Sequence, residues 1–513
     1  MQKIERKKRK SRPGLRWALL AAAAVILAGS LLAARLLQPE PRKPEPSVHP
    51  KTLLAQYEPS EVREVRAALR SGETWRLTVL EDGSVRGTDA GGTFEADAGM
   101  ARRVLAAVCV VEAQETLAED LSQVGEAPGV FGFDPDRLTL TVDYTDGSRL
   151  TLHVGDRGPE ESWYYLTREG DPALYCWDTG SVSDVTLEAA LLHRVPQPEL
   201  HQARIDRIRV QSGETVRSWE LDAAITDADA ADRWMLTEPT RYPADGEAVK
   251  TLRRNLINLR MGGYAAPDTP ENRKRYHLDE PAWVITVHQA AGETLETRED
   301  GSTAARAWPE EELTFTVSPS DNELIDWVAW EGTICTVSHF LVRGVVNTAP
   351  EDTLTRYPVL TSLSNLRRLT VEDARGETHV WTVTRTERVA PNNALVMDEQ
   401  GNVVMDTEVT CDGQAMRRET FEAGYGQLLL VTVSGTLPAY WAGSEAEAHT
   451  RMVFETETGA VHRLALSPFD ALHDAVWLDG SAVFYLVKDG LNWPLLLPEA
   501  PAASGGRSRG SAR

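Results

Sequence analysis

Four cysteines and eleven histidines are the residues of this chain that could hold a metal ion or act as a nucleophile and its base. Zinc sites use clustered cysteine and histidine ligands, usually with close pairs. Here no two cysteines form a C-x-x-C pair, and they are Cys109, Cys176, Cys335 and Cys411. We therefore expect no metal site and no cofactor. A disulfide between Cys109 and Cys176 is left open, because an oxidising compartment would permit one.

Acidic residues could supply a calcium site or a pair of catalytic carboxylates. A cluster precedes Trp234 and consists of Asp222, Asp227, Asp229 and Asp232. The glycine and the distal glutamate of an EF-hand loop are absent at the required spacing, so we interpret the cluster as a solvated loop. The single G-x-S-x-G match, residues 506–510, lacks the flanking strand and helix of a nucleophile elbow. The sequence therefore predicts a protein that is not an enzyme.

Aromatic residues on either side of Gly170 are the candidates for binding a partner. They are Trp163, Tyr164, Tyr165, Tyr175 and Trp177. Aromatic side chains supply rigid contact area at interfaces. Since successive residues of a strand point to opposite faces of a sheet, the competing interpretation is that alternate members pack in the core.

Charge is distributed unevenly along the 513 residues. The net charge is -23, yet residues 1–16 contain eight basic groups and one acidic group, a net charge of +7. The remainder therefore carries a net charge of -30. An acidic body argues against binding to nucleic acid, because phosphate neutralisation requires a basic face.

A membrane anchor is expected directly after the basic arm. Residues 17–34 contain no charged side chain, and Leu36 and Leu37 extend the apolar stretch beyond Arg35. About 20 apolar residues span a bilayer core, and basic flanks stay in the cytoplasm. We predict a cytoplasmic arm at residues 1–16 and a single-pass signal anchor at residues 17–37, with an extracytoplasmic body. Cleavage as a signal peptide is the alternative, although no small-x-small motif precedes the prolines.

The body is bordered by segments of unusual composition. Five prolines between residues 39 and 50 predict an extended spacer at residues 38–58. Residues 498–513 are rich in glycine, serine and arginine toward their end, which predicts a disordered tail.

Three sets of landmarks recur along the body in the same order. A Gly-Glu-Thr triplet follows a short alternating apolar segment at residues 72–74, 213–215 and 376–378. Candidate helix starts follow at Asp97, Asp245 and Asp412, since an aspartate can accept hydrogen bonds from the free N–H groups of a first helical turn. Alternating apolar residues then indicate further hairpins, of which Asp146–Gly147 is the clearest turn.

These landmarks predict an α+β fold. Each unit would contain antiparallel β-hairpins packed with a helix, and three such modules would stand in tandem after one N-terminal transmembrane helix. We place the modules at residues 59–198, 199–362 and 363–497.

The arrangement resembles the family called domain of unknown function 4340. Residues 234–239 match its Trp-x-Leu-x-x-Pro segment, and residues 131–134 and 276–279 resemble its Tyr-Gly-Leu-Asp-like turn. His277 stands where the turn has glycine, and the third module lacks most of this motif. The resemblance extends over about residues 60–495 and carries no catalytic residues. It implies a membrane-anchored extracytoplasmic protein whose relatives are linked to an auxiliary component of an ABC-type transport system named for gliding motility.

We therefore expect a non-enzymatic scaffold, docking protein or ligand-capture protein that serves the permease and ATPase of an ABC-type transporter or another envelope assembly. One alternative is a cell-envelope hydrolase acting on glycan or peptide, which would need acid and base carboxylates converging in a cleft. Another is an extracytoplasmic sensor, against which the 16-residue cytoplasmic arm argues because it leaves no room for a signalling domain.

Overall fold

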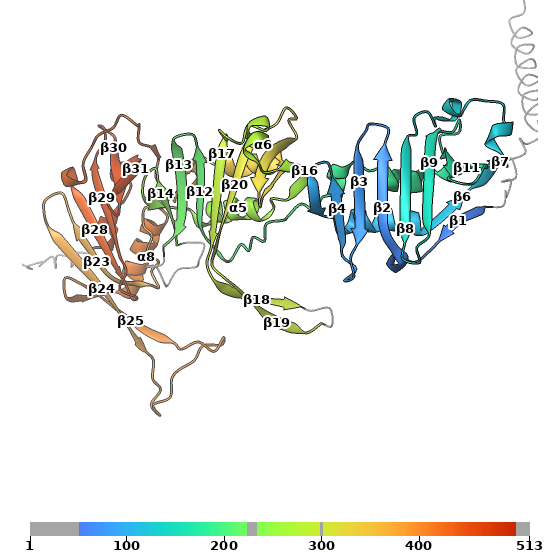
Figure 1. Cartoon of the computed structure of the whole chain (residues 1–513). Helices are drawn as coiled ribbons and strands as arrows, with labels where there is room; N and C mark the ends of the chain where they lie inside the picture. The colour runs from blue at the N-terminus through green and yellow to red at the C-terminus, as the bar shows by residue number, and fades with distance from the viewer. Residues whose placement is uncertain (1–50, 223–232, 298–300, 499–513) are drawn as a thin grey trace, which may run out of the picture. The chain divides into compact units, whose positions relative to one another are not determined.

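The computed structural model describes residues 51–222, 233–297 and 301–498 (Figure 1). The chain is mostly antiparallel β-sheet with a few helices, so the predicted α+β class is confirmed. The predicted cytoplasmic arm and signal anchor, residues 1–37, lie outside the described residues, as do residues 38–50 of the spacer and residues 499–513 of the tail. No helix within the described ranges is long and apolar enough to cross a membrane.

The chain divides into two compact units, one containing Met1–Gly83 and Arg102–Thr186, the other Ser84–Ala101 and Leu187–Arg513. In the first unit, seven strands are hydrogen-bonded in the order β3-β2-β8-β9-β10-β11-β7. Their bounds are Thr74–Val79, Val62–Leu69, Leu138–Tyr144, Arg149–Arg157, Trp163–Arg168, Leu174–Asp178 and Glu115–Ala118. Helix α2 (Ala98–Cys109) contributes Val104 and Val108 to the core, and the Tyr144 hydroxyl of β8 donates to the Val108 carbonyl at 3.2 Å.

Part of the predicted spacer is a strand. Residues Thr52–Gln56 form β1, which pairs antiparallel with β6 (Val110–Ala113). The predicted spacer at residues 38–58 therefore extends too far toward its C-terminal end. Residues 51–58 contain no proline, and Leu54 and Ala55 are buried, which favours a paired strand.

Helix α3 (Thr179–Val185) ends the first unit. The second unit contains the paired strands β4 (Val85–Asp89) and β5 (Gly92–Glu95), helix α4 (Ala189–Leu192) and two nine-stranded sheets. The first of these sheets has the order β15-β14-β13-β12-β17-β20-β21-β22-β16. Its strands span Tyr242–Pro243, Trp234–Glu238, Thr215–Leu221, Ile205–Ser212, Trp283–Gln289, Glu311–Pro319, Ile325–Trp330, Thr333–Ser338 and Met261–Pro267. Its helices are α5 (Gly246–Ile257), α6 (Pro270–Arg275) and α7 (His339–Val346).

The last sheet repeats this order as β26-β25-β24-β23-β28-β29-β30-β31-β27. Its strands span Gln414–Met416, Met405–Cys411, Thr378–Glu387, Leu366–Glu372, Thr450–Thr456, Val461–Pro468, His473–Leu478, Ser481–Val487 and Gly435–Thr436, and its helix is α8 (Arg418–Leu429). In all three large sheets an N-terminal hairpin lies beside a later four-stranded meander, and an edge strand lies on the far side of the meander. In the second unit this edge strand comes directly after the long helix of the sheet, and in the first unit it comes after α2 and β6.

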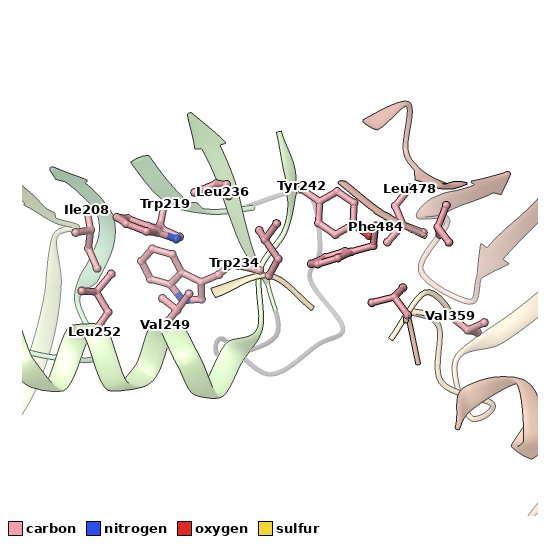
Figure 2. Packing of buried hydrophobic residues seen from close by; sticks show 14 of the residues in the cluster. Ile208, Trp219, Trp234, Leu236, Tyr242, Val249, Leu252, Val359, Leu478 and Phe484 are labelled. Atoms are coloured by element: carbon pink, nitrogen blue, oxygen red, sulfur yellow. The ribbon is translucent and has the colours of Figure 1, made fainter. Parts of the chain in front are cut away.

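A single buried cluster joins the two sheets of the second unit (Figure 2). In the β12–β17 sheet, Trp219 and Trp234 lie above Val249 of α5, and all three are almost fully buried. Tyr242 of β15 then meets Phe484 of β31 edge to face, with ring centroids 5.6 Å apart. Because no solvent layer separates these aromatic rings, the two sheets share one hydrophobic core.

Two of the three predicted helix starts are confirmed. Asp97 Oδ1 accepts a hydrogen bond from the Met100 amide at 2.9 Å, and Asp245 Oδ1 accepts one from the Ala248 amide at 2.8 Å. The prediction at Asp412 is wrong. Asp412 and Gly413 both have positive φ values, 51° and 79°, and form the two-residue turn between β25 and β26. An Asp-Gly pair suits such a hairpin turn, so it competes with helix capping here.

The two family-like turns share one backbone feature. Gly132 has φ 81° and His277, at the corresponding position, has φ 58°. Glycine adopts this left-handed conformation freely, whereas a residue with a Cβ is strained there. His277 therefore keeps the turn at a cost in stability, and buried Leu278 (1% exposed) packs immediately after it.

Replacement of Phe484 by alanine should destabilise both sheets of the second unit together. Phe484 is fully buried in the shared cluster, and loss of a buried phenylalanine costs about 3–5 kcal/mol. Urea unfolding followed by tryptophan fluorescence and by circular dichroism should show one shifted transition for the two sheets. Tyr440→Ala, at a side chain that is 87% exposed, is the matched control and should leave the midpoint unchanged. A variant whose β12–β17 sheet unfolds at the original midpoint would contradict the shared core.

Candidate functional site

A two-stranded ribbon leaves the β12–β17 sheet between β17 and β20. It consists of β18 (Gly292–Thr297) and β19 (Thr303–Trp308), which pair only with each other among the described strands. Figure 1 shows the ribbon extending away from the sheet from which it arises. An isolated hairpin is marginally stable in water, so its base must be held by other contacts.

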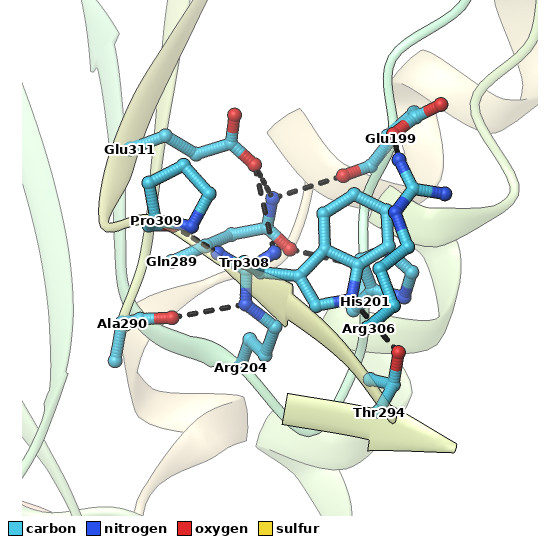
Figure 3. A network of polar contacts seen from close by, with 10 residues as sticks. All are labelled: Glu199, His201, Arg204, Gln289, Ala290, Thr294, Arg306, Trp308, Pro309 and Glu311. Atoms are coloured by element: carbon cyan, nitrogen blue, oxygen red, sulfur yellow. Dashed lines mark hydrogen bonds and ion pairs between the residues drawn. The ribbon is translucent and has the colours of Figure 1, made fainter. Parts of the chain in front are cut away.

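Trp308 forms the apolar part of that base (Figure 3). Its side chain is buried, and its Nε1 donates to Thr294 Oγ1 across the ribbon at 2.8 Å. The Arg306 guanidinium lies 3.6 Å from the indole centroid, and the His201 ring centroid lies 4.2 Å away. A cation over an indole face is attracted by the ring quadrupole, which adds to the burial of the ring.

Arg204 holds both ends of the ribbon at once. Its side chain is almost fully buried, although it carries a positive charge. Its Nε donates to the Ala290 carbonyl at 2.9 Å, just before β18, and its Nη2 donates to the Pro309 carbonyl, just after β19. Glu311 Oε1 lies 3.7 Å from Nη1 and supplies the opposite charge. Because a buried charge is costly unless paired, this arrangement strongly favours one position of the two chain ends.

Gln289 completes the anchor and is fully buried. Its Nε2 donates to the Glu199 carbonyl at 3.0 Å and to Glu311 Oε1 at 2.7 Å, and its Oε1 accepts from the His201 amide at 2.7 Å. In these three hydrogen bonds Nε2 only donates and Oε1 only accepts, so the Gln289 amide has a single orientation. The anchor therefore joins the segment before β12 to the base of the ribbon.

Beyond this base the ribbon presents side chains to solvent. Leu295 is 78% exposed, and its cross-strand partner Ala305 and the nearby Ala307 are also exposed. Cross-strand partners, and residues two apart on one strand, share a face, so these three side chains form one apolar strip, which Glu293 borders opposite Ala307. A rigidly held ribbon with exposed apolar side chains is suited to contact with a partner.

The predicted aromatic residues divide between two faces of the β10–β11 hairpin. Trp177, Tyr175 and Tyr164 are buried, as the core interpretation expected. Trp163 and Tyr165 are half-buried on the other face, with ring centroids 4.9 Å apart. Phe131 adds an edge contact 5.0 Å from Tyr165. A role in partner binding stays a prediction for these five residues, and the exposed ring area belongs mainly to Trp163 and Tyr165.

The four cysteines are buried free thiols, so Cys109 and Cys176 are not joined in this structure. Burial raises the pKa of Cys109 to about 11 and that of Cys335 to about 12. A thiol with such a pKa holds almost no thiolate at neutral pH and is a poor nucleophile.

His288 lies next to Gln289 on β17. Its Nδ1 contacts Asp206 Oδ1 and its Nε2 lies 2.9 Å from Glu310 Oε1, so carboxylates occupy both ring nitrogens. The hydrogen bond that the ring donates to Asp206, and then the one to Glu310, raise the pKa of His288 above its ordinary value of 6.5, against the lowering effect of burial. With both nitrogens engaged, the ring has none left to activate a nucleophile.

The predicted acidic loop is only partly described. Asp222 Oδ2 lies 3.1 Å from the Arg241 guanidinium, whereas Asp227, Asp229 and Asp232 lie outside the described residues. No group of three potential metal ligands converges within the described ranges.

The ribbon was not among the predicted elements, because the alternating apolar residues were interpreted only as hairpins of the sheets. The chain leaves the sheet before Gly292, where β18 begins, and returns to it only at β20. A signal was present in the larger spacing of 163 residues between the second and third Gly-Glu-Thr triplets, against 141 between the first and second.

Replacement of Arg204 by alanine should loosen the ribbon. The Ala290 and Pro309 carbonyls would lose a charged donor, and such bonds contribute about 1.5–3 kcal/mol. Amide hydrogen exchange measured by mass spectrometry should become faster in β18 and β19. Arg207→Ala, which removes a half-buried arginine of β12 that pairs with Glu312 of β20 across β17, is the control and should leave exchange in the ribbon unchanged. Equal protection in both variants would show that Arg204 does not anchor the ribbon.

The stability of the second unit should depend on pH through His288. Since its folded pKa is raised, protonation stabilises the fold; the contribution is complete below the unfolded value of 6.5 and is lost as the pH rises through the folded value. Urea midpoints compared at about pH 6 and about pH 9 should therefore fall with pH more in the native protein than in His288→Gln. An identical pH dependence in the two proteins would contradict this assignment.

Comparison with known families gives a match to the middle of the chain. Residues 234–324 match the family described as Domain of unknown function (DUF4340). This segment begins with β14 and contains the ribbon, Gln289 and Glu311, whereas Arg204 and His201 precede it. None of the curated proteins compared with the chain matches it. The match includes the Trp-x-Leu-x-x-Pro segment and the turn at residues 276–279, and it confirms the family that these motifs indicated. The likeness to the DUF4340 family is therefore shown for residues 234–324.

Proposed function

We propose that this protein is a membrane-anchored, extracytoplasmic docking scaffold without enzymatic activity. The observation that carries the proposal is the ribbon β18–β19, whose base is held by buried Arg204 and Gln289 while Leu295 stays 78% exposed. A buried polar anchor holds the ribbon in one direction, and a marginal hairpin gains nothing for its own stability by exposing leucine. Presentation of the ribbon to a partner accounts for both features.

The three large sheets are, in this proposal, three copies of one module at residues 59–198, 199–362 and 363–497. Their common strand order supports this division. The first copy has no counterpart to the ribbon between β8 and β9, which are joined by a short turn at Gly147. Serial copies of one module with different insertions would offer different contacts along one chain.

The anchor and the location rest on the sequence. The basic residues 1–16 and the apolar residues 17–37 support a single-pass anchor with a cytoplasmic N-terminus, and the net charge of -30 beyond residue 16 suits a solvated body outside the membrane. The link to the permease and ATPase of an ABC-type transporter, or to another envelope assembly, rests on the family resemblance.

The proposal that the protein is not an enzyme is supported by the state of its reactive groups. The Cys109, Cys335 and Cys411 thiols have pKa values raised by burial to about 11 or 12, and both nitrogens of His288 contact carboxylates. These contacts stabilise the fold and do not prepare a nucleophile.

Purification of tagged full-length protein in mild detergent tests the docking role. We expect a membrane protein to be recovered with it in constant ratio, and we expect Leu295→Asp to reduce that ratio because it places a charge in the apolar strip. Leu324→Asp, at a side chain that is 77% exposed outside the ribbon, is the matched control. Recovery without a membrane partner, together with hydrolysis of peptidoglycan or peptide by the pure protein, would overturn the proposal.

The topology can be measured separately in spheroplasts. Protease added from outside should digest the body after residue 58 and leave residues 1–16 protected by the membrane. Protection of the body would contradict an extracytoplasmic location.

A further inference from the structure

A second projection arises in the last sheet, between β24 and β25. The two strands pair as far as Glu387 and Met405, and residues 388–404 then fold into short adjacent segments. Val389 pairs with Leu395, and Met397 pairs with Val403. We call residues 387–406 the β24–β25 arm.

One face of the β24–β25 arm is apolar. Cross-strand partners, and residues two apart along a strand, lie on the same face. The pairings above therefore place five side chains together, and these are Val389, Leu395, Met397, Val403 and Met405. Val389, Leu395, Met397 and Met405 are 52%, 42%, 53% and 39% exposed, so the face lies open to solvent. Contiguous exposed apolar side chains of this kind mark interaction sites.

The arm does not need this face for its own folding. On the reverse face Arg388 Nε donates to Asp406 Oδ1 at 2.8 Å, and this hydrogen bond raises the pKa of Arg388. At one turn Asp398 Oδ1 accepts hydrogen bonds from the amides of Gln400 at 2.9 Å and Asn402 at 2.8 Å. The arm is thus shaped by polar contacts behind and beside the apolar face, which remains unpartnered within the described chain.

The charges around the face are mainly acidic. The arm has four acidic residues and one arginine, a net charge of -3. Arg388 neutralises Asp406, whereas Glu387, Asp398 and Glu399 are exposed. Glu387 pairs with Met405, so it ends the apolar face and forms part of its rim. An anionic lipid surface would repel this rim, and a basic surface would attract it.

We propose that the β24–β25 arm binds a partner protein that offers an apolar groove with a rim of lysine and arginine side chains. This inference rests on the proposed docking function and names the chemistry of one partner surface. A second copy of the chain is disfavoured as the occupant, because two copies of the arm would bring their acidic rims together.

Site-specific photo-cross-linking in the native cell envelope tests the inference. The full-length protein would carry p-benzoylphenylalanine in place of Leu395, and the cross-linked peptide would be identified by mass spectrometry. We expect a protein adduct in which the cross-linked peptide is apolar and has lysine or arginine close by in the partner's surface. The same photoreactive residue in place of Tyr440, 87% exposed and outside the arm, is the matched control and should not give this adduct.

Charge reversal tests the rim. Glu387→Lys combined with Glu399→Lys should lower the yield of the adduct by about tenfold, which corresponds to about 1.4 kcal/mol. Neither residue is buried, so the urea midpoint should be unchanged, which separates lost binding from lost folding. The inference would be overturned by an adduct with lipid, by an adduct with a second copy of the chain, or by the absence of any adduct. It would also be overturned if charge reversal left the yield unchanged.

The Leu295→Asp measurement keeps this test distinct from that of the docking function. If partner recovery depends on Leu295 but the arm gives no protein adduct, the inference about the arm fails and the docking function stands. If neither projection contacts a protein, both fail. Vesicles of neutral and of anionic phospholipid serve as the lipid probe, and sedimentation with either that depends on Leu395 and Met397 would also overturn the inference.

Discussion

The requirement that a buried charge be paired governs how this protein presents its candidate docking site. Arg204 is 6% exposed and donates hydrogen bonds to the carbonyls on either side of the ribbon. If the ribbon turned away from this position, the buried guanidinium would lose its two carbonyl acceptors and keep only Glu311, 3.7 Å from Nη1, which is unfavourable. The ribbon is therefore held firmly at its base although its strands pair only with each other among the described strands.

The two projections of the second unit achieve exposure in different ways. The ribbon depends on an anchor supplied by the segment before β12, through Arg204 and the Glu199 carbonyl that binds Gln289. The β24–β25 arm carries its own polar contacts, of which the Arg388–Asp406 pair is the clearest. In both cases polar groups determine the shape, and apolar side chains face solvent. This reverses the usual relation between core and surface, and it is a reason to regard the projections as contact surfaces.

The shared core gives these projections a common base. Tyr242 and Phe484 join the two sheets of the second unit through an edge-to-face contact in one buried cluster. A partner that binds the ribbon and the arm would therefore meet two surfaces carried by one packed body. Binding energy gained at one projection would not be spent on ordering a hinge between the two sheets.

Much of the local structure could be predicted from sequence because it depends on near neighbours. Alternating apolar residues and Asp-Gly turns indicated the hairpins, Asp97 and Asp245 indicated two helix starts, and the motifs near Trp234 indicated the family. Asp412 shows the limit, since the same residue type can cap a helix or turn a hairpin, and only its neighbours in β24 and β25 select the turn.

By itself the sequence determined the α+β class and the DUF4340 assignment, because periodicity and turn chemistry are local properties of the chain. The tertiary structure decided which side chains are buried and which are presented. Trp177 and Trp163 lie on neighbouring strands of one hairpin and differ only in the face they occupy. Arg204 is a buried anchor because Ala290 and Pro309, 86 and 105 residues farther along the chain, fold back over it. Contacts between residues so distant in sequence arise from packing, which no local pattern encodes.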